Sequence, residues 1–242
     1  MHCTPRLLSL LVVTNLALLG ALAFLIVTGF AARDPKVLSL ERLDIVSPEG
    51  KTVIAISNKE RIAGPVVGGK TYPVATSDGR EQMAGMIFFN QDGDEMGGLV
   101  FNSFRRPDGK AAGIGHLSFD RFQDNQVLAL QYKENAAGVQ SGLTLYDRPA
   151  NGHFKTSMDL IDEARTATTE RRAEIQETLS SWRQNAELGV ERVFVGSKDD
   201  GAQLLLRDSR GRERARLIID PRDEARLEFL DAEGQIVARF PE

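Results

Sequence analysis

The chain has 242 residues, with 30 Lys or Arg and 34 Asp or Glu, so its formal net charge is −4. Residues 7–32 carry no charged side chain, and the remainder from residue 33 on has a net charge of −5. A mildly acidic chain of mixed sign lacks the basic face of a nucleic-acid-binding protein, so we expect no nucleic-acid partner. The one cysteine is Cys3, which excludes disulfides within the chain and thiolate chemistry after residue 3.

The N-terminal part predicts a short tail over 1–6, a transmembrane helix over 7–30 and a linker over 31–41. Asn15 is the only strongly polar side chain of the apolar run, and 18 or more such residues normally span a bilayer. A signal peptide cleaved after Ala31 is the alternative, but its apolar region is usually about 7–15 residues long. We therefore expect a single-pass membrane protein anchored by this span. The bulk of the chain is predicted to be extracytoplasmic, although the flanking charges leave the orientation open.

Four stretches of the body repeat one pattern: apolar residues seven and five before a Gly, a short polar residue three before it, and an apolar residue six after it. The four end on Gly50, Gly93, Gly211 and Gly234. Alternating apolar residues place one face of a strand against a core, the polar residue can close a turn, and Gly supplies a positive φ. Each copy is therefore predicted to be a β-hairpin.

Extending this pattern predicts a mainly β fold of repeated antiparallel hairpins, arranged as a meander or as a barrel- or propeller-like array. The predicted strands are 42–47, 52–57, 84–90, 97–104, 113–120, 126–133, 141–147, 191–197, 202–208, 213–219, 225–231 and 235–240.

One long amphipathic helix is predicted over 157–188, where neither Gly nor Pro occurs and apolar residues recur at three- and four-residue steps. We expect it to pack on the sheet; the alternative is a helix that faces a partner. It separates an N-terminal lobe, 42–150, from C-terminal hairpin repeats over 190–242, and the two could form separate lobes.

Groupings typical of catalysis are missing from the sequence. His116 and His153 have no neighbouring ligand at zinc-binding spacing, and neither a nucleophile elbow nor a phosphate loop occurs. We therefore predict no catalytic residues, no metal site and no cofactor.

Binding residues are predicted in two segments. The 58–82 loop breaks the hairpin rhythm, and loops of this length are commonly functional or disordered; its basic residues, which include Arg80, could bind an anionic group. The alternative is a flexible cover that Ile62, Val66 and Val67 hold over the sheet. The second segment is the acidic turn 90–95, which could bind Ca²⁺ but lacks the full twelve-residue loop, so a solvated hairpin turn is the favoured interpretation. The candidate ligand-binding residues are Lys59, Arg61, Lys70, Tyr72, Asn90, Asp92, Asp94 and Glu95.

Several motifs resemble a family of uncharacterised bacterial single-pass membrane proteins. They are Arg42-Leu-Asp-Ile-Val46, Ser57-Asn-Lys-Glu-Arg61 followed by Gly64-Pro65, and Gly85-Met-Ile-Phe-Phe-Asn-Gln-Asp-Gly-Asp-Glu-Met-Gly-Gly-Leu-Val-Phe101. The resemblance implies a bacterial source and an anchored β-rich domain, and it implies no activity, cofactor or catalytic residue.

Two functions are compatible with these features. The favoured hypothesis is a membrane-anchored, extracytoplasmic binding or scaffold module of the bacterial cell envelope, with an envelope protein as a possible partner and an unknown oligomeric state. The alternative is a hydrolase of envelope glycans, because that chemistry often needs only two carboxylates across a cleft. The candidate carboxylates are Asp92, Asp94, Glu95 and Asp120.

Overall fold

The computed structural model describes residues 5–31, 36–77, 79–198 and 201–241. The chain divides into two compact units, Met1–Leu40 and Glu41–Glu242. The predicted tail 1–6, the linker 31–41 and the cleavage point after Ala31 lie partly outside the described residues.

The first unit contains one helix, α1 (Pro5–Ala31). Within the part of the chain that the structure describes, no helix is long and apolar enough to cross a membrane. The predicted transmembrane helix over 7–30, and the single-pass location that rested on it, are therefore wrong.

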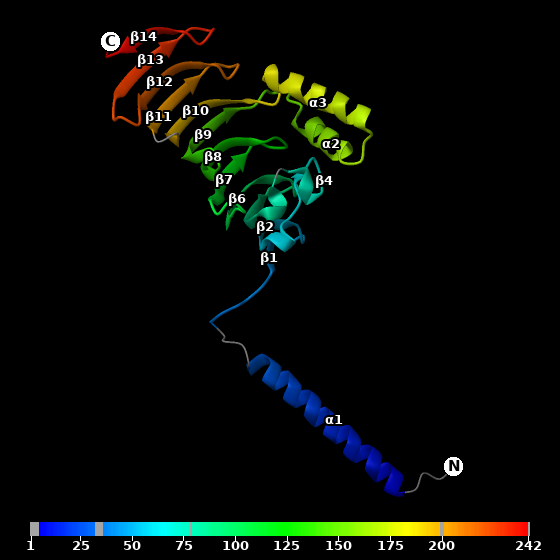
Figure 1. Ribbon diagram of the computed structural model, residues 1–242. Coiled ribbons are helices and arrows are strands. Elements are labelled where there is room, and N and C mark those ends of the chain that lie inside the picture. Colours follow the sequence, from blue (N-terminus) through cyan, green and yellow to red (C-terminus); the bar gives the residue numbers. More distant parts are fainter. Residues whose placement is uncertain (1–4, 32–35, 78, 199–200, 242) are drawn as a thin grey trace. The chain divides into compact units, whose positions relative to one another are not determined.

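The second unit is built on one antiparallel sheet of twelve strands, in which each strand pairs with the next sheet strand along the chain (Figure 1). The sheet strands are β1 (Arg42–Val46), β2 (Thr52–Ser57), β5 (Ala84–Phe89), β6 (Glu95–Arg105), β7 (Ala111–Asp120), β8 (Gln126–Asn135), β9 (Gly138–Asp147), β10 (Val190–Lys198), β11 (Gly201–Arg207), β12 (Glu213–Ile219), β13 (Ala225–Leu230) and β14 (Ile236–Phe240). The mainly β class and the meander are confirmed. The predicted barrel- or propeller-like closure is wrong, because β1 and β14 form the two free ends of the strand order.

Within the described ranges, seven hairpins of the sheet close with the same two backbone hydrogen bonds in the turn. In the β5–β6 turn, for example, the amide of Asn90 donates to the carbonyl of Asp94 (2.9 Å), and that of Gly93 donates to the carbonyl of Asn90 (3.0 Å). The Asn90 side chain also accepts from the amides of Asp92 and Asp94. Gly93 has a φ of 90°, which side chains other than Gly rarely allow. In the copies that end on Gly93, Gly211 and Gly234, the short polar side chain closes the turn as predicted, whereas Ser47 Oγ of the first copy accepts no such hydrogen bond among the described residues.

Two helices stand where one was predicted: α2 (Phe154–Ala164) and α3 (Thr169–Gln184). The single long helix over 157–188 is wrong because Thr168 caps a new helix, and its side chain accepts a hydrogen bond from the amide of Arg171 (3.3 Å). The helices pack against each other beside the sheet (Figure 1). Strands β9 and β10, which flank the helices in the chain, pair directly, so the strands before and after the helices form one sheet.

The 58–82 loop folds into short elements over one face of the sheet. They are η1 (Lys59–Arg61), β3 (Val66–Val67), β4 (Lys70–Thr71), η2 (Val74–Thr76) and η3 (Arg80–Gln82). Ile62 packs with Ala55 and Ile87 of the sheet, and Val67 and Tyr72 pack with Met158 of α2. We call the sheet face beneath this loop and the helix pair the covered face.

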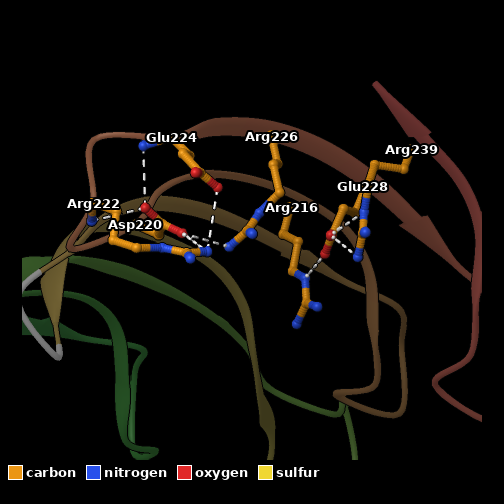
Figure 2. Close-up of polar contacts among 7 residues, drawn as sticks. All are labelled: Arg216, Asp220, Arg222, Glu224, Arg226, Glu228 and Arg239. Atoms are coloured by element: carbon orange, nitrogen blue, oxygen red, sulfur yellow. Dashed lines mark hydrogen bonds and ion pairs between the residues drawn. The ribbon is translucent and has the colours of Figure 1, made fainter. Parts of the chain in front are cut away.

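The covered face changes character along the sheet. One row of paired residues crosses the strands on this face: Ala55, Ile87, Gly98, Ser118, Ala129, Thr144, Phe194, Leu205, Arg216, Glu228 and Arg239. From Ala55 to Leu205 the row is buried. Over β12–β14 it becomes a ladder of charges, in which Glu228 accepts from Arg216 (2.6 Å) and Arg239 (2.7 Å) (Figure 2). The core of the unit therefore lies under the loop and helices, and the last strands carry a polar surface on this side.

Candidate functional site

The candidate site is a polar cavity on the covered face, between the 58–82 loop, strands β6–β8 and the helix pair. Its volume is about 450 Å³. A smaller neighbouring cavity of about 210 Å³ shares part of its wall, including Arg80 and Glu95. The residues that line the larger cavity and carry hydrogen-bonding groups on their side chains are Thr76, Ser77, Arg80, Glu95, Asp120, Asp124, Asn125, Gln126, Ser157 and Arg183.

An ion pair lies in the wall between the two cavities. Arg80 begins η3 in the loop, and Glu95 begins β6 of the sheet. The guanidinium Nη1 donates to Glu95 Oε1 (3.2 Å), and Nη2 lies 2.9 Å from Oε2. The pair therefore joins the loop to the sheet, and both partners are largely removed from solvent.

Two carboxyl groups at this site hold their protons more tightly than usual. Burial and, second, the negative charge of Glu95 raise the pKa of Asp120 to about 7, against the opposing effect of Arg148. Burial also raises the pKa of Glu95, although Arg80 opposes the shift. Near neutral pH, Asp120 can thus donate or accept a proton.

Several polar atoms at the cavity have no hydrogen-bond partner among the described residues. They are Thr76 Oγ1, Arg80 Nε and Asp120 Oδ1. Thr76 and Arg80 are only 4% and 7% exposed. Buried polar groups are normally paired, so these atoms are available to a molecule that enters the cavity.

Hydrogen bonds from the predicted site residues fasten the loop. Tyr72 is buried, and its hydroxyl donates to Asp159 of α2 (2.9 Å). Lys70 also donates to Asp159 (2.7 Å), and its Nζ lies 4.4 Å from the centre of the Tyr72 ring. Asp94 is buried and accepts from the amide of Gly69 (2.7 Å) and from the side chain of Gln123 (3.0 Å). The structure therefore brings three of the predicted residues together as fastenings of the loop.

The other predicted residues divide between the surface and the cavity. Lys59 and Arg61 are exposed in η1, where they form ion pairs with Glu60 and Glu41. Asn90 and the exposed Asp92 belong to the β5–β6 turn. Only Glu95 lines the cavity, where it lies with Asp120, a carboxylate predicted for the hydrolase.

Sequence reasoning missed most of the cavity wall. Arg80 was recognisable as one of several basic residues in an unusual loop, but its partner Glu95 could not be identified from spacing. Thr76 and Gln126 carry no signal in the sequence, since a hydroxyl or an amide in a loop or strand is common. Among the described residues, no group of three or more His, Cys, Asp or Glu is placed to hold a metal ion.

Comparison with known proteins adds no relative. No family model matches the chain, and neither a curated protein nor a solved structure matches it. The resemblance to a family of bacterial proteins therefore stays a prediction.

Proposed function

We propose that the protein is a non-enzymatic binding module, in which the 58–82 loop closes a ligand site on the sheet. The main support for this proposal is the cavity of about 450 Å³, whose wall contains hydrogen-bonding atoms that lack partners among the described residues. The loop is fastened to the sheet through Asp94 and to α2 through Tyr72. A site held in this way is pre-organised, which lowers the entropy lost on binding.

The chemistry of the wall favours a neutral ligand rich in hydroxyl groups, such as a sugar. Arg80 and Glu95 already neutralise each other, so a charged ligand would leave one charge unmatched. Thr76 Oγ1 can donate or accept, Arg80 Nε can donate, and Asp120 Oδ1 can accept. Apolar side chains of α2, Phe154 and Met158, line another part of the cavity and could contact the carbon face of a sugar ring.

Titration calorimetry of the full chain with two neutral sugars, chitotriose and maltotriose, tests this function, with inorganic phosphate and spermidine as charged probes. We expect saturable binding of a neutral sugar and none of the charged probes. Thr76→Val keeps the shape of the side chain and removes one hydrogen bond worth about 0.5–1.5 kcal/mol, so the dissociation constant should rise about 2- to 12-fold.

Thr71→Val is the matched control, because Thr71 is exposed in β4 of the same loop and does not line the cavity. It should bind as tightly as the unaltered protein. Binding of phosphate alone, or equal effects of the two Thr→Val changes, would contradict the proposal.

One observation favours a second candidate function, a glycan hydrolase. Glu95 and Asp120 line the same cavity, and burial raises the pKa of both. A carboxyl group protonated near neutral pH can act as the general acid of glycoside hydrolysis, with a second carboxylate as base or nucleophile. Release of reducing ends from chitotriose or maltotriose, lost in Asp120→Asn, would support hydrolysis; binding without release supports the module.

A further inference from the structure

The sheet face opposite the covered face carries two apolar rows, each crossing all twelve strands. We call it the apolar face. The first row is Leu43, Ile56, Met86, Leu99, Leu117, Leu130, Leu143, Val195, Leu204, Leu217, Leu227 and Phe240. The second is Ile45, Ile54, Phe88, Gly97, Phe119, Leu128, Leu145, Val193, Leu206, Ala215, Phe229 and Ala238. Neither row contains a charged or hydrogen-bonding side chain.

Much of this apolar face is exposed in the single chain. Leu130 in β8 is 53% exposed, and Val195 in β10 and Leu217 in β12 are each 47% exposed. Their sequence neighbours on the covered face, Ala129 and Phe194, are 0% and 4% exposed. Strand alternation normally puts apolar residues on the buried side and polar residues on the solvent side, and here the exposed side of the sheet carries apolar rows.

The two faces differ most at the C-terminal strands β12–β14. There the covered face bears the ladder Arg216–Glu228–Arg239, and Asp220 nearby pairs with Arg226 (3.2 Å) (Figure 2). These charges suit contact with water. On the apolar face of the same strands, Leu217, Leu227 and Phe229 are 36–47% exposed. The distribution therefore marks the apolar face, and not the charged one, as the side that needs a partner.

The size of the apolar face matches a stable protein interface. Strands lie about 4.8 Å apart and residues of one face about 7 Å apart along a strand, so two rows over twelve strands cover roughly 700 Å². Two such surfaces in contact would bury about 1,400 Å² in total, within the range of about 1,200–2,000 Å² for specific complexes. Exposed apolar patches on single-chain proteins are usually about 300–600 Å² at most.

We propose that a second copy of this chain covers the apolar face, so that two sheets stack face to face at about 10 Å, as in a β-sandwich. Because the rows carry no charge, they offer nothing for a charged partner to match, whereas a second set of the same rows matches them in polarity and extent. A two-fold axis that lies between the two sheets and parallel to them would place each copy's rows on the other's, which is the self-complementary contact of a two-fold dimer.

The mass of the full chain in solution, measured by sedimentation velocity from 1 to 50 µM, tests this proposal. We expect twice the chain mass of 26.6 kDa. Leu130→Arg places a charge at the centre of the apolar face on an already exposed side chain, so it should leave the monomer folded and weaken dimerisation at least 100-fold. Circular dichroism checks the fold of each variant.

Val237→Arg is the matched control. Val237 is 63% exposed in β14, and it alternates with Ala238 of the second apolar row, so it faces the opposite side. This variant should remain dimeric. A monomeric unaltered chain at 50 µM would overturn the proposal, and so would a Leu130→Arg variant that is still dimeric, because association would then use the sheet edges or α1. The polar cavity lies on the covered face, so the sugar-binding assay with Thr76→Val is a separate test.

Discussion

Gly97 in β6 is a position where the structure predicts a sharp effect of a single methyl group. Its φ is 118°, and a Cβ built there would lie 2.2 Å from the carbonyl oxygen of Ser118 and 3.0 Å from the Cα of Phe119. The rings of Phe88 and Phe119 approach each other across this strand, with their centres 6.1 Å apart. Both atoms that a Cβ would meet belong to the backbone of the neighbouring strand, so a rotamer change cannot relieve the overlap.

Gly97→Ala should therefore lower the free energy of unfolding by about 3–5 kcal/mol. Backbone strain at such a φ contributes about 1–3 kcal/mol. Moving β7 away from β6 would weaken at least one ladder hydrogen bond, at about 1 kcal/mol, and would loosen the packing of the two rings, at about 1 kcal/mol.

Gly115→Ala in β7 is the matched control. The nearest atoms to a Cβ at Gly115 lie 3.9 Å away, and its φ is not in the left-handed region. Removing a glycine where alanine fits restricts the unfolded chain, so this change should be neutral or stabilise by up to about 1 kcal/mol. Urea unfolding followed by circular dichroism measures both variants. A Gly97→Ala protein within 1 kcal/mol of the unaltered chain, or an equal loss in Gly115→Ala, would refute the reasoning.

Three further predictions concern charged groups. Glu228→Gln should destabilise the fold by about 2–3 kcal/mol at pH 7, whereas Glu233→Gln in the exposed β13–β14 turn should cost under 0.5 kcal/mol, as urea unfolding would show. Burial raises the pKa of Glu228, but the hydrogen bonds from Arg216 and Arg239 outweigh it and lower the pKa, so this stability should be lost as the pH falls below about 4. The pKa of Asp120 is raised to about 7, so ionisation of its carboxyl group should lower the free energy of unfolding progressively as the pH rises from about 4 through 7. Asp120→Asn should remove this pH dependence and stabilise the chain at pH 8 by up to about 4 kcal/mol. An unchanged pH dependence in the variant would refute this prediction. Asp159→Asn should loosen the 58–82 loop and speed its cleavage in limited proteolysis, while Asp92→Asn should not. The hydrogen bond from Lys70 lowers the pKa of Asp159 to about 2, so acid should loosen the loop only as the pH falls from about 4 towards 2.

Local chemistry explains why so much of the sheet was predictable. The spacing of Leu204 and Leu206 before the turn residues Asp208 and Gly211 is a pattern within ten positions, and the structure places strands and a turn there. All twelve sheet strands lie within three residues of their predicted bounds. The short strands β3 and β4 were not predicted, because two-residue strands leave no periodic pattern.

The predictions from sequence were wrong where the structure depends on competition between local signals or on contacts between residues far apart in the chain. Residues 157–188 lack Gly and Pro, yet the cap at Thr168 divides them into two helices. The hydropathy of residues 7–30 predicted a membrane span that the described residues do not support. Whether a meander closes into a barrel depends on whether β1 pairs with β14, and no local sequence pattern encodes that pairing.

The sequence by itself determined the strands, their order and their turns, because alternation and turn chemistry act between near neighbours. It also determined that Leu130 and Val195 are apolar, but not that they would lie in one exposed row with ten other residues, since that depends on the register of eleven strand pairs. Only the tertiary structure placed Arg80 against Glu95 and Asp120 in one cavity, because burial and long-range pairing set both the geometry and the pKa of these groups. The binding surfaces of this protein are thus products of packing between distant segments.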